Sequence, residues 1–223
     1  MIRKTKLAPG EFYHIYSRGN SKQKIFLKPA DYRRFVRLLF LCNTRKQILL
    51  RDIPPHKTFK FDREETIVDI GCYCLMPNHI HLVMKEKVDG GISLFMKKLL
   101  TAYSMYFNTI NKRTGVLFEG RFKSKHASND NYLKYLYAYV HLNPVKLTDS
   151  KWKEFGLQDF RKTKDHLANY QYSSYLDYLG GDREEKSILN IKSFPEYFSE
   201  KRSFDDLINF WLTQRTVLDE EMI

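Results

Sequence analysis

The stretch Met76-Pro77-Asn78-His79-Ile80-His81-Leu82-Val83-Met84 decides the fold, because a turn signal leads directly into an alternating strand. Side chains on a strand point alternately to its two faces, so His79 and His81 share one face while Ile80 and Leu82 point into the packing. Two neutral imidazoles on one face can hold a divalent metal once a third polar ligand arrives from elsewhere in the fold. The spacing alone leaves open a second interpretation, in which both histidines are half-buried structural residues.

The patterns around this stretch predict an antiparallel sheet with helices. Period-two patterns and turn signals predict strands over residues 12–16, 66–75, 79–84 and 116–125. Apolar residues at helical spacing predict helices over 29–40, 93–108 and 132–141. The order strand, helix, strand, strand, helix, strand, extra helix is typical of an α+β fold with a ferredoxin-like sheet and helices on one face.

Residues outside this pattern set the domain organisation. Residues 51–65, with Pro54-Pro55 and dense charge, read as a long connection. After Lys151 the pattern changes to aromatic and helical segments, broken at Gly180-Gly181 and followed by the acidic residues 219–221. We therefore expect a core domain over residues 1–150 and a helical or irregular C-terminal extension over 151–223, packed on that domain or beside it.

Composition and charge narrow the partner and the compartment. The 223 residues are 43% hydrophobic and carry a net charge of +12, which favours a polyanionic partner such as nucleic acid. The mean hydropathy is −0.51 and no run approaches the roughly 20 apolar residues that cross a bilayer, so no membrane partner is expected. The N-terminal residues lack the apolar core of a signal peptide, and three cysteines (Cys42, Cys72 and Cys74) fit a reducing environment. The expected location is the cytoplasm, on the nucleoid when bound to DNA.

Basic residues concentrate in one part of the chain and suggest a surface for DNA. Aromatic residues are interleaved with them, which suits a groove that holds phosphates and stacks bases, although a solvated helix face would have a similar composition. Arg18, beside a Gly-Asn turn, is a further candidate for phosphate contact. The other predicted DNA-binding residues are Lys97, Lys98, Lys112, Arg113, Arg121, Lys123 and Lys125, and the interleaved aromatics are Tyr103, Tyr106, Phe107, Phe118 and Phe122.

Four motifs in order resemble a known family. They are MPNHIH at residues 76–81, KLLTAYSMYFN at 98–108, GRF at 120–122 and YVHLNPVK at 139–146, the last preceded by Tyr132-Leu133. Their combination, over roughly residues 8–180, resembles the REP-associated tyrosine transposases, which are single-tyrosine HUH transposases of the IS200-like fold.

This resemblance implies an enzyme that nicks and rejoins single-stranded DNA near hairpins through a covalent 5′-phosphotyrosine. The family pattern selects Tyr139 as the nucleophile, with Tyr135 as the second candidate. His79 and His81 would hold a divalent metal, for which oxygen-rich coordination favours Mg²⁺ or Mn²⁺. Asn143, four residues after Tyr139, is the expected third ligand and His126 its rival. Pro144 disfavours helical dihedrals at Asn143, so a second interpretation is that the Asn143 side chain only caps the helix end. The protein would act as a monomer or a homodimer.

Three other functions remain open at this point. A domesticated, catalytically silent protein of the same fold would bind DNA without forming an adduct. A histidine-triad nucleotide hydrolase is disfavoured, because it would need a third histidine where Val83 stands. A zinc-stabilised RNA-binding module would need Cys72 and Cys74 to join the two histidines.

Overall fold

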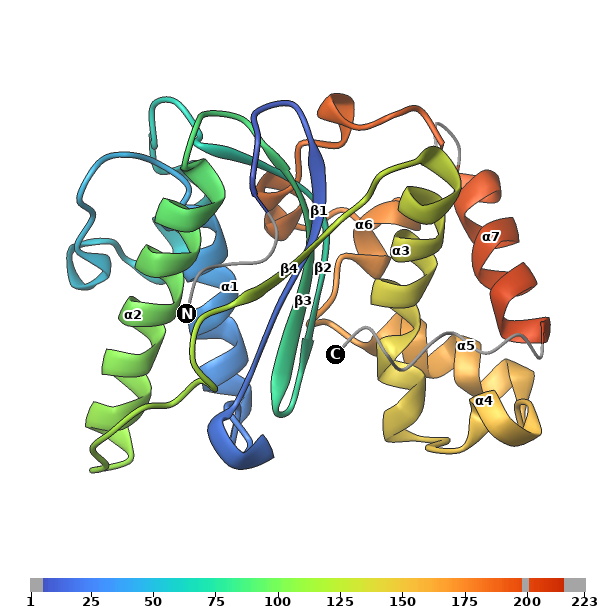
Figure 1. The fold of residues 1–223 in the computed structure, drawn as a ribbon. Helices are drawn as coiled ribbons and strands as arrows, with labels where there is room; N and C mark the ends of the chain where they lie inside the picture. Colours follow the sequence, from blue (N-terminus) through green and yellow to red (C-terminus); the bar gives the residue numbers. More distant parts are fainter. Residues whose placement is uncertain (1–5, 198–200, 215–223) are drawn as a thin grey trace.

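The computed structural model describes residues 6–197 and 201–214, and its centre is an antiparallel sheet (Figure 1). The strand order is β2-β3-β1-β4. The predicted hairpin is present, since Met76 pairs with His79 at the turn. The strands are β1 (Phe12–Arg18), β2 (Val68–Met76), β3 (His79–Glu86) and β4 (Lys123–His126).

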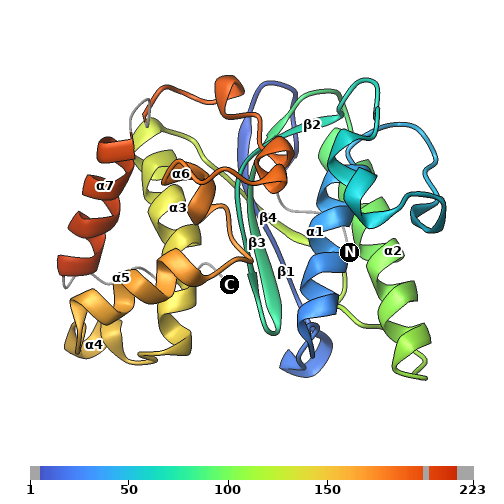
Figure 2. The same ribbon diagram turned by 180° about the vertical axis from the view of Figure 1, so that it is seen from behind.

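Helices cover both faces of the sheet, as Figures 1 and 2 show. Helices α1 (Pro29–Leu41) and α2 (Gly91–Ile110) lie on one face. Helix α3 (Asp130–Leu142) lies on the other and starts where the Asn129 side chain accepts a hydrogen bond from the Tyr132 amide at 2.8 Å. The predicted α+β fold class is therefore confirmed. Helices were expected on one face of the sheet, and α3 forms an additional layer on the other face.

The segment after residue 150 packs on α3 and on β2. Its helices are α4 (Trp152–Phe155), α5 (Phe160–Asn169), α6 (Tyr175–Tyr178) and α7 (Lys201–Thr213). Short 3-10 turns cover Asn20–Lys22, Leu50–Asp52, Pro55–Lys60, Asn143–Leu147, Glu184–Ile188 and Ile191–Ser193. The predicted acidic tail at residues 219–221 lies outside the described part of the chain.

The extension is held by polar contacts as well as apolar ones. The Ser174 hydroxyl accepts a hydrogen bond from the Tyr73 amide at 2.9 Å, and the Ser174 amide donates to the Tyr73 carbonyl at 3.0 Å. Arg183 donates to Asp177 at 2.6 Å and to the Ser173 carbonyl at 2.6 Å. These contacts fix α6 against strand β2.

The alternation of each strand divides the core into two clusters. Ile80, Leu82 and Met84 of β3 pack with α1 and α2, whereas Val83 packs with α3. A bulge at Gly71 brings β2 close to α3, because a Cβ there would lie 2.5 Å from the Tyr137 hydroxyl. The two layers therefore share a sheet and have separate interiors.

The predicted strand over 116–125 is wrong for most of its length. Only residues 123–126 form a strand, and residues 116–122 are a loop beside the end of β1, with a bridge between Phe118 and Gly19 and a hydrogen bond from the Glu119 amide to the Arg18 carbonyl at 2.8 Å. Gly115 and Gly120 have positive φ values of 83° and 64°, which interrupt an extended chain. Among the described helices, none is long and apolar enough to cross a membrane.

Candidate active site

His79 and His81 lie on the α3 face of β3 with ring centroids 4.8 Å apart. The Nδ1 atom of His79 is 2.7 Å from Oδ1 of Asn78. Because a carbonyl oxygen only accepts, Nδ1 of His79 carries the proton and Nε2 keeps a lone pair. The Nε2 atoms of both histidines are buried and make no hydrogen bond within the described structure, which is rare for buried polar atoms.

A third imidazole, which the sequence reasoning did not assign to the site, comes from His14 on β1. Its Nε2 is 2.9 Å from Nδ1 of His81, and the two rings stack at 5.0 Å. His14 lies two residues before Tyr16, which is directly opposite His81 in the β1/β3 register. An isolated histidine in a predicted strand carries no such signal until the neighbouring strand is known.

Burial keeps these imidazoles neutral. It lowers the pKa of His14 to about 3 and that of His79 to about 4, and it lowers the pKa of His81 well below its usual value. Nearby lysines lower the pKa of each ring further. Neutral imidazole is the form that ligates metal ions, so these side chains are competent ligands at neutral pH.

Tyr139 of α3 faces the histidines. Its ring meets the edges of the His81 ring at 5.4 Å and of the His14 ring at 5.6 Å. Tyr135, one turn earlier, lies 6.0 Å from Tyr139 and packs against Trp211 at 5.1 Å. Tyr137 is on the opposite side of α3, buried beside Tyr178 with a raised pKa. Of the two candidates for the nucleophile, Tyr139 is therefore the one in contact with the histidines.

Asn143 connects α3 to the histidines. Its Nδ2 donates to the Tyr139 carbonyl at 2.8 Å, which caps the helix. Burial lowers the pKa of His79, and the Asn143 side chain partly offsets that effect by favouring the protonated ring. Contrary to the effect expected of Pro144, Asn143 is helical (φ −52°, ψ −41°), because α3 continues into a 3-10 turn.

The structure does not bring His126 to this site. His126 lies opposite Tyr13 in the β1/β4 register, on the face that α1 and α2 cover. Its Nε2 is 2.6 Å from the Glu11 carboxylate. The expectation for His126 was wrong because side chains alternate between the two faces of a strand. In β4 this alternation places Lys125, and not His126, on the face of the histidines.

The cysteines form no metal centre with the histidines. Burial raises the pKa of the Cys72 and Cys74 thiols well above the usual value, which keeps them protonated. Within residues 6–197 and 201–214, no three His, Cys, Asp or Glu side chains converge as a metal-binding group. The zinc-module hypothesis therefore has no support in the described part, whereas two imidazoles and a carboxamide are a different set of ligands.

Cations surround the site, and sequence reasoning identified only some of them. Lys123 and Lys125 share the face of Tyr16 and His14, as the β1/β4 register requires, and Arg18 pairs with Glu119 at 3.0 Å. The reasoning missed Lys153, whose Nζ lies 5.4 Å from the Tyr139 ring centroid, and Lys146, which lowers the pKa values of His79 and His81. Lys153 lies in α4 of the C-terminal extension, beyond Lys125, the last of the predicted DNA-binding residues.

Arg121, in the loop before β4, lines a crevice with Tyr16, Arg18 and Lys123 beside the site. The remaining predicted DNA-binding residues lie elsewhere. Lys98 donates to the Lys46 carbonyl at 2.7 Å, and Arg113 packs over Phe107 at 5.7 Å. The interleaved aromatics are core residues except for Tyr106, which is partly exposed. The cations on α2 and just after it, on the far side of the sheet from the histidines, are Lys97, Lys98, Lys112 and Arg113.

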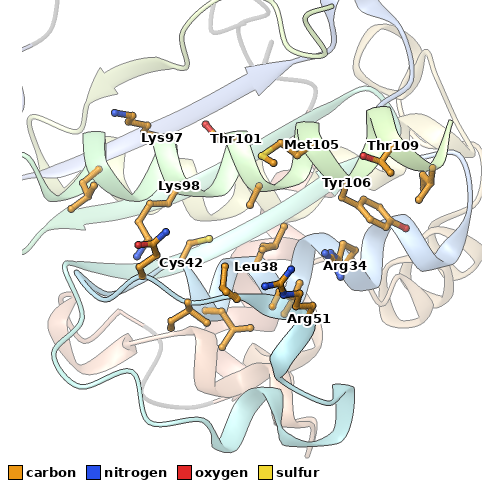
Figure 3. Close-up of a pocket in the computed structure, with 18 residues that line it drawn as sticks. Arg34, Leu38, Cys42, Arg51, Lys97, Lys98, Thr101, Met105, Tyr106 and Thr109 are labelled. Carbon is orange, nitrogen blue, oxygen red and sulfur yellow. The ribbon is translucent and has the colours of Figure 1, made fainter. Parts of the chain in front are cut away.

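A cavity of about 720 Å³ lies on the α1/α2 side, away from the histidines. Figure 3 shows side chains of α2, among them Met105 and Tyr106, facing Leu38 and Arg34 of α1. Lys97 and Lys98 lie at the same cavity, whose lining is mostly apolar. The chemistry-bearing side chains and this cavity are thus on opposite sides of the sheet.

Comparison with known proteins gives one family and several similar solved structures. The model of the family described as IS200-like transposase matches residues 31–143. A solved REP-associated tyrosine transposase bound to a REP hairpin is 13% identical, with 83% of this chain and 90% of that chain covered and a TM-score of 0.49. The tRNA(His) guanylyltransferase of Saccharomyces cerevisiae is 16% identical, with coverage of 88% and 86% and a TM-score of 0.34. No curated protein matches the sequence significantly.

Proposed function

The chain belongs to the IS200-like transposase family, as its motifs predict, and from this premise we propose that it nicks and rejoins single-stranded DNA through a covalent 5′-phosphotyrosine at Tyr139. The observation that carries this proposal is the contact of the Tyr139 ring with His14 and His81, beside Asn143. A tyrosine ester stores the energy of the cleaved bond, so the strand can be joined again without another energy source.

The reaction is an in-line exchange at phosphorus. The Tyr139 oxygen forms a bond to the scissile phosphorus and loses its proton, while the bond from phosphorus to the 3′ oxygen breaks and that oxygen gains a proton. The 5′ end stays attached to the protein. Attack by another 3′-hydroxyl reverses the exchange and releases Tyr139. Lys153, near the Tyr139 ring, and Lys146 place positive charge close to the phosphate.

The residues present fit a divalent cation. Nε2 of His79, Nε2 of His81 and Oδ1 of Asn143 would hold Mg²⁺ or Mn²⁺, and the two buried nitrogens without partners support this assignment. When bound, the cation neutralises charge on the phosphoryl oxygens. His14 would support this arrangement. If its Nε2, 2.9 Å from Nδ1 of His81, acts as the acceptor, the proton stays on Nδ1 and the His81 Nε2 lone pair is free for the cation.

The proposed substrate is a DNA strand with an unpaired segment beside a hairpin. The motif resemblance supports the hairpin, and the net charge of +12 together with the lysines around Tyr139 supports a polyanion. We further propose that the protein acts in the cytoplasm on nucleoid DNA, as a monomer or a homodimer.

A trapping experiment tests this function. The protein is incubated with a panel of hairpin-bearing single strands and Mg²⁺ or Mn²⁺, and the products are resolved in SDS. We expect an SDS-resistant protein–DNA adduct that is absent with Tyr139→Phe and absent in chelator. If the unaltered protein binds these strands and forms no adduct with any of them, the enzyme proposal fails and the silent DNA-binding alternative replaces it.

A further inference from the structure

Tyr16 presents a partly exposed ring next to the candidate active site. It follows His14 by two residues on β1 and therefore points to the same face. Its ring stacks on His14 at 5.0 Å with an interplanar angle of 24° and lies 6.2 Å from the His81 ring. The Nζ atom of Lys123 lies over the Tyr16 ring, 5.9 Å from its centroid. Tyr16 thus packs against the histidines on one side, and the Lys123 ammonium group lies over its ring.

The crevice beside Tyr16 is rich in positive charge. Arg18, Arg121 and Lys123 line it with Tyr16, and among the described residues Glu119 is its one carboxylate. Arg18 binds that carboxylate through two nitrogens at 3.0 and 3.1 Å, so Glu119 is already paired. Arg121 and Lys123 are exposed at the same crevice. A flat ring among cations is the combination that binds a nucleotide by base and phosphate together.

A second ring of the same kind comes from α3. Tyr132 is partly exposed, stacks on Tyr135 at 6.0 Å and carries Lys125 over its ring at 5.4 Å. Tyr135 in turn lies 6.0 Å from Tyr139. Burial raises the pKa of Tyr132, and the Tyr16 hydroxyl raises that pKa further. Both ring stacks therefore converge on Tyr139, one along β1 and one along α3.

We propose that Tyr16 and Tyr132 are stacking surfaces for unpaired nucleobases that flank the scissile phosphate. In the free protein Lys123 and Lys125 rest over these rings; with DNA bound, each ammonium group moves to a phosphate and a base takes its place. A base inside a duplex already has both faces stacked, so the two rings select unpaired nucleotides. This inference rests on the proposed function for the position of the cleaved bond.

Base-analogue fluorescence in the full-length Tyr139→Phe protein tests the proposal without consuming the DNA. Hairpin strands carry 2-aminopurine at successive unpaired positions, and its emission is quenched when it stacks on an aromatic ring. We expect quenching at one or two positions. Tyr16→Leu should abolish it at one of them and weaken affinity for the single strand by about 5-fold to 150-fold, the range for one stacked base. Tyr16→Phe, which keeps the ring, should retain both properties.

The second tyrosine and a control residue keep the test decisive. Tyr132→Leu, on a different element, should remove quenching at a different nucleotide. Tyr106 is the matched control, because it is a partly exposed tyrosine with Arg34 over its ring at 4.8 Å but lies on α2, across the sheet. Tyr106→Leu should change neither quenching nor affinity.

Each outcome separates this inference from the proposed function. The stacking proposal is overturned if the Tyr139→Phe protein quenches no position, or if quenching and affinity are unchanged in both Tyr16→Leu and Tyr132→Leu. It stands if quenching depends on these rings even when the unaltered protein forms no covalent adduct, and in that case only the enzyme proposal fails.

Discussion

The two faces of the sheet differ in what the same strands present to them. On the α1/α2 face, β3 contributes Ile80 and Leu82 to an apolar interior. On the α3 face, the alternate residues His79 and His81 lie side by side, and the His81 ring meets Tyr139. Both faces are stabilised by apolar burial, and the α3 face in addition holds buried histidine nitrogens whose burial costs free energy. The comparison teaches that a single strand can carry the core and the chemistry together, because period two keeps them apart.

The largest expected effect separates the nucleophile from its neighbours on α3. Tyr139→Phe removes only a hydroxyl, so adduct formation should fall by about 10³-fold or more while DNA affinity stays nearly unchanged. SDS gels and a binding titration measure the two quantities. The matched variant Tyr135→Phe should keep the adduct. An adduct that persists in Tyr139→Phe and disappears in Tyr135→Phe would move the nucleophile to Tyr135.

Alternate residues of β3 should respond in opposite ways. Leu82→Ala should lower the free energy of unfolding by about 2 to 5 kcal/mol through a cavity, while the fraction that remains folded keeps its cleavage activity. His79→Ala or His81→Ala should lose cleavage with a smaller loss of stability, since a buried imidazole is a costly core residue. Thermal melts and adduct assays on the same samples compare them. Equal losses of stability and activity in the histidine variants would favour the structural interpretation of the pair.

Acid should loosen the α3 layer before the α1/α2 layer. His141 is buried between the Tyr137 carbonyl (2.8 Å) and the Ser174 hydroxyl (2.7 Å), and burial lowers its pKa to about 3. The unfolded chain binds a proton below about pH 6.5 and the folded chain does not, so stability is complete above that pH and falls as pH decreases toward 3.

At pH 4.5 this one residue should cost about 3 kcal/mol, from two pH units below the unfolded pKa. Denaturant titrations at pH 7 and pH 4.5 measure the loss, and His141→Gln should reduce it. Amide exchange should show earlier opening in α3 than in α2. Equal acid sensitivity of the two helices would contradict a difference between the faces.

Asn143→Ala tests whether the Asn143 side chain both caps α3 and binds the metal. Loss of Oδ1 should raise the metal concentration for half-maximal cleavage by about 10-fold to 100-fold, and loss of the cap should lower stability by about 0.5 to 2 kcal/mol. Metal titrations in the adduct assay and thermal melts in chelator separate the two effects. His126→Ala is the control, because His126 lies on the other face beside Glu11. A shift of the metal titration in His126→Ala alone would assign the ligand role to His126.

The smallest expected effect is the change in the salt dependence of DNA binding when a single lysine is replaced. Lys123→Gln should reduce the slope of log affinity against log salt by about 0.7, the contribution of one phosphate contact on a single strand. Lys112→Gln, an exposed cation after α2, should leave the slope unchanged. Binding isotherms at several salt concentrations provide the slopes. Equal changes in both variants would mean that DNA contacts both layers.

Sequence patterns predicted most of the elements, because turns and periodicity are local. They identified the β2/β3 hairpin and the shared face of His79 and His81, which depend on adjacent residues. They missed His14 and Lys153, since the first becomes relevant only when β1 pairs with β3 and the second only when the extension packs near α3. The strand start at Lys123 was also missed, and with it the face of His126. Non-local pairing decides these features.

The bond between the Tyr73 amide and the Ser174 hydroxyl joins residues that are 101 positions apart. Closing so long a loop is slow compared with forming the β2/β3 hairpin, whose partners are neighbours in the chain. We therefore expect the sheet to fold first on α1 and α2, and the packing behind α3 to be completed last. In a newly made chain, the sheet with α1 and α2 would then be folded before Tyr139 is held beside the histidines. DNA cleavage would therefore begin only when the final step of folding is complete.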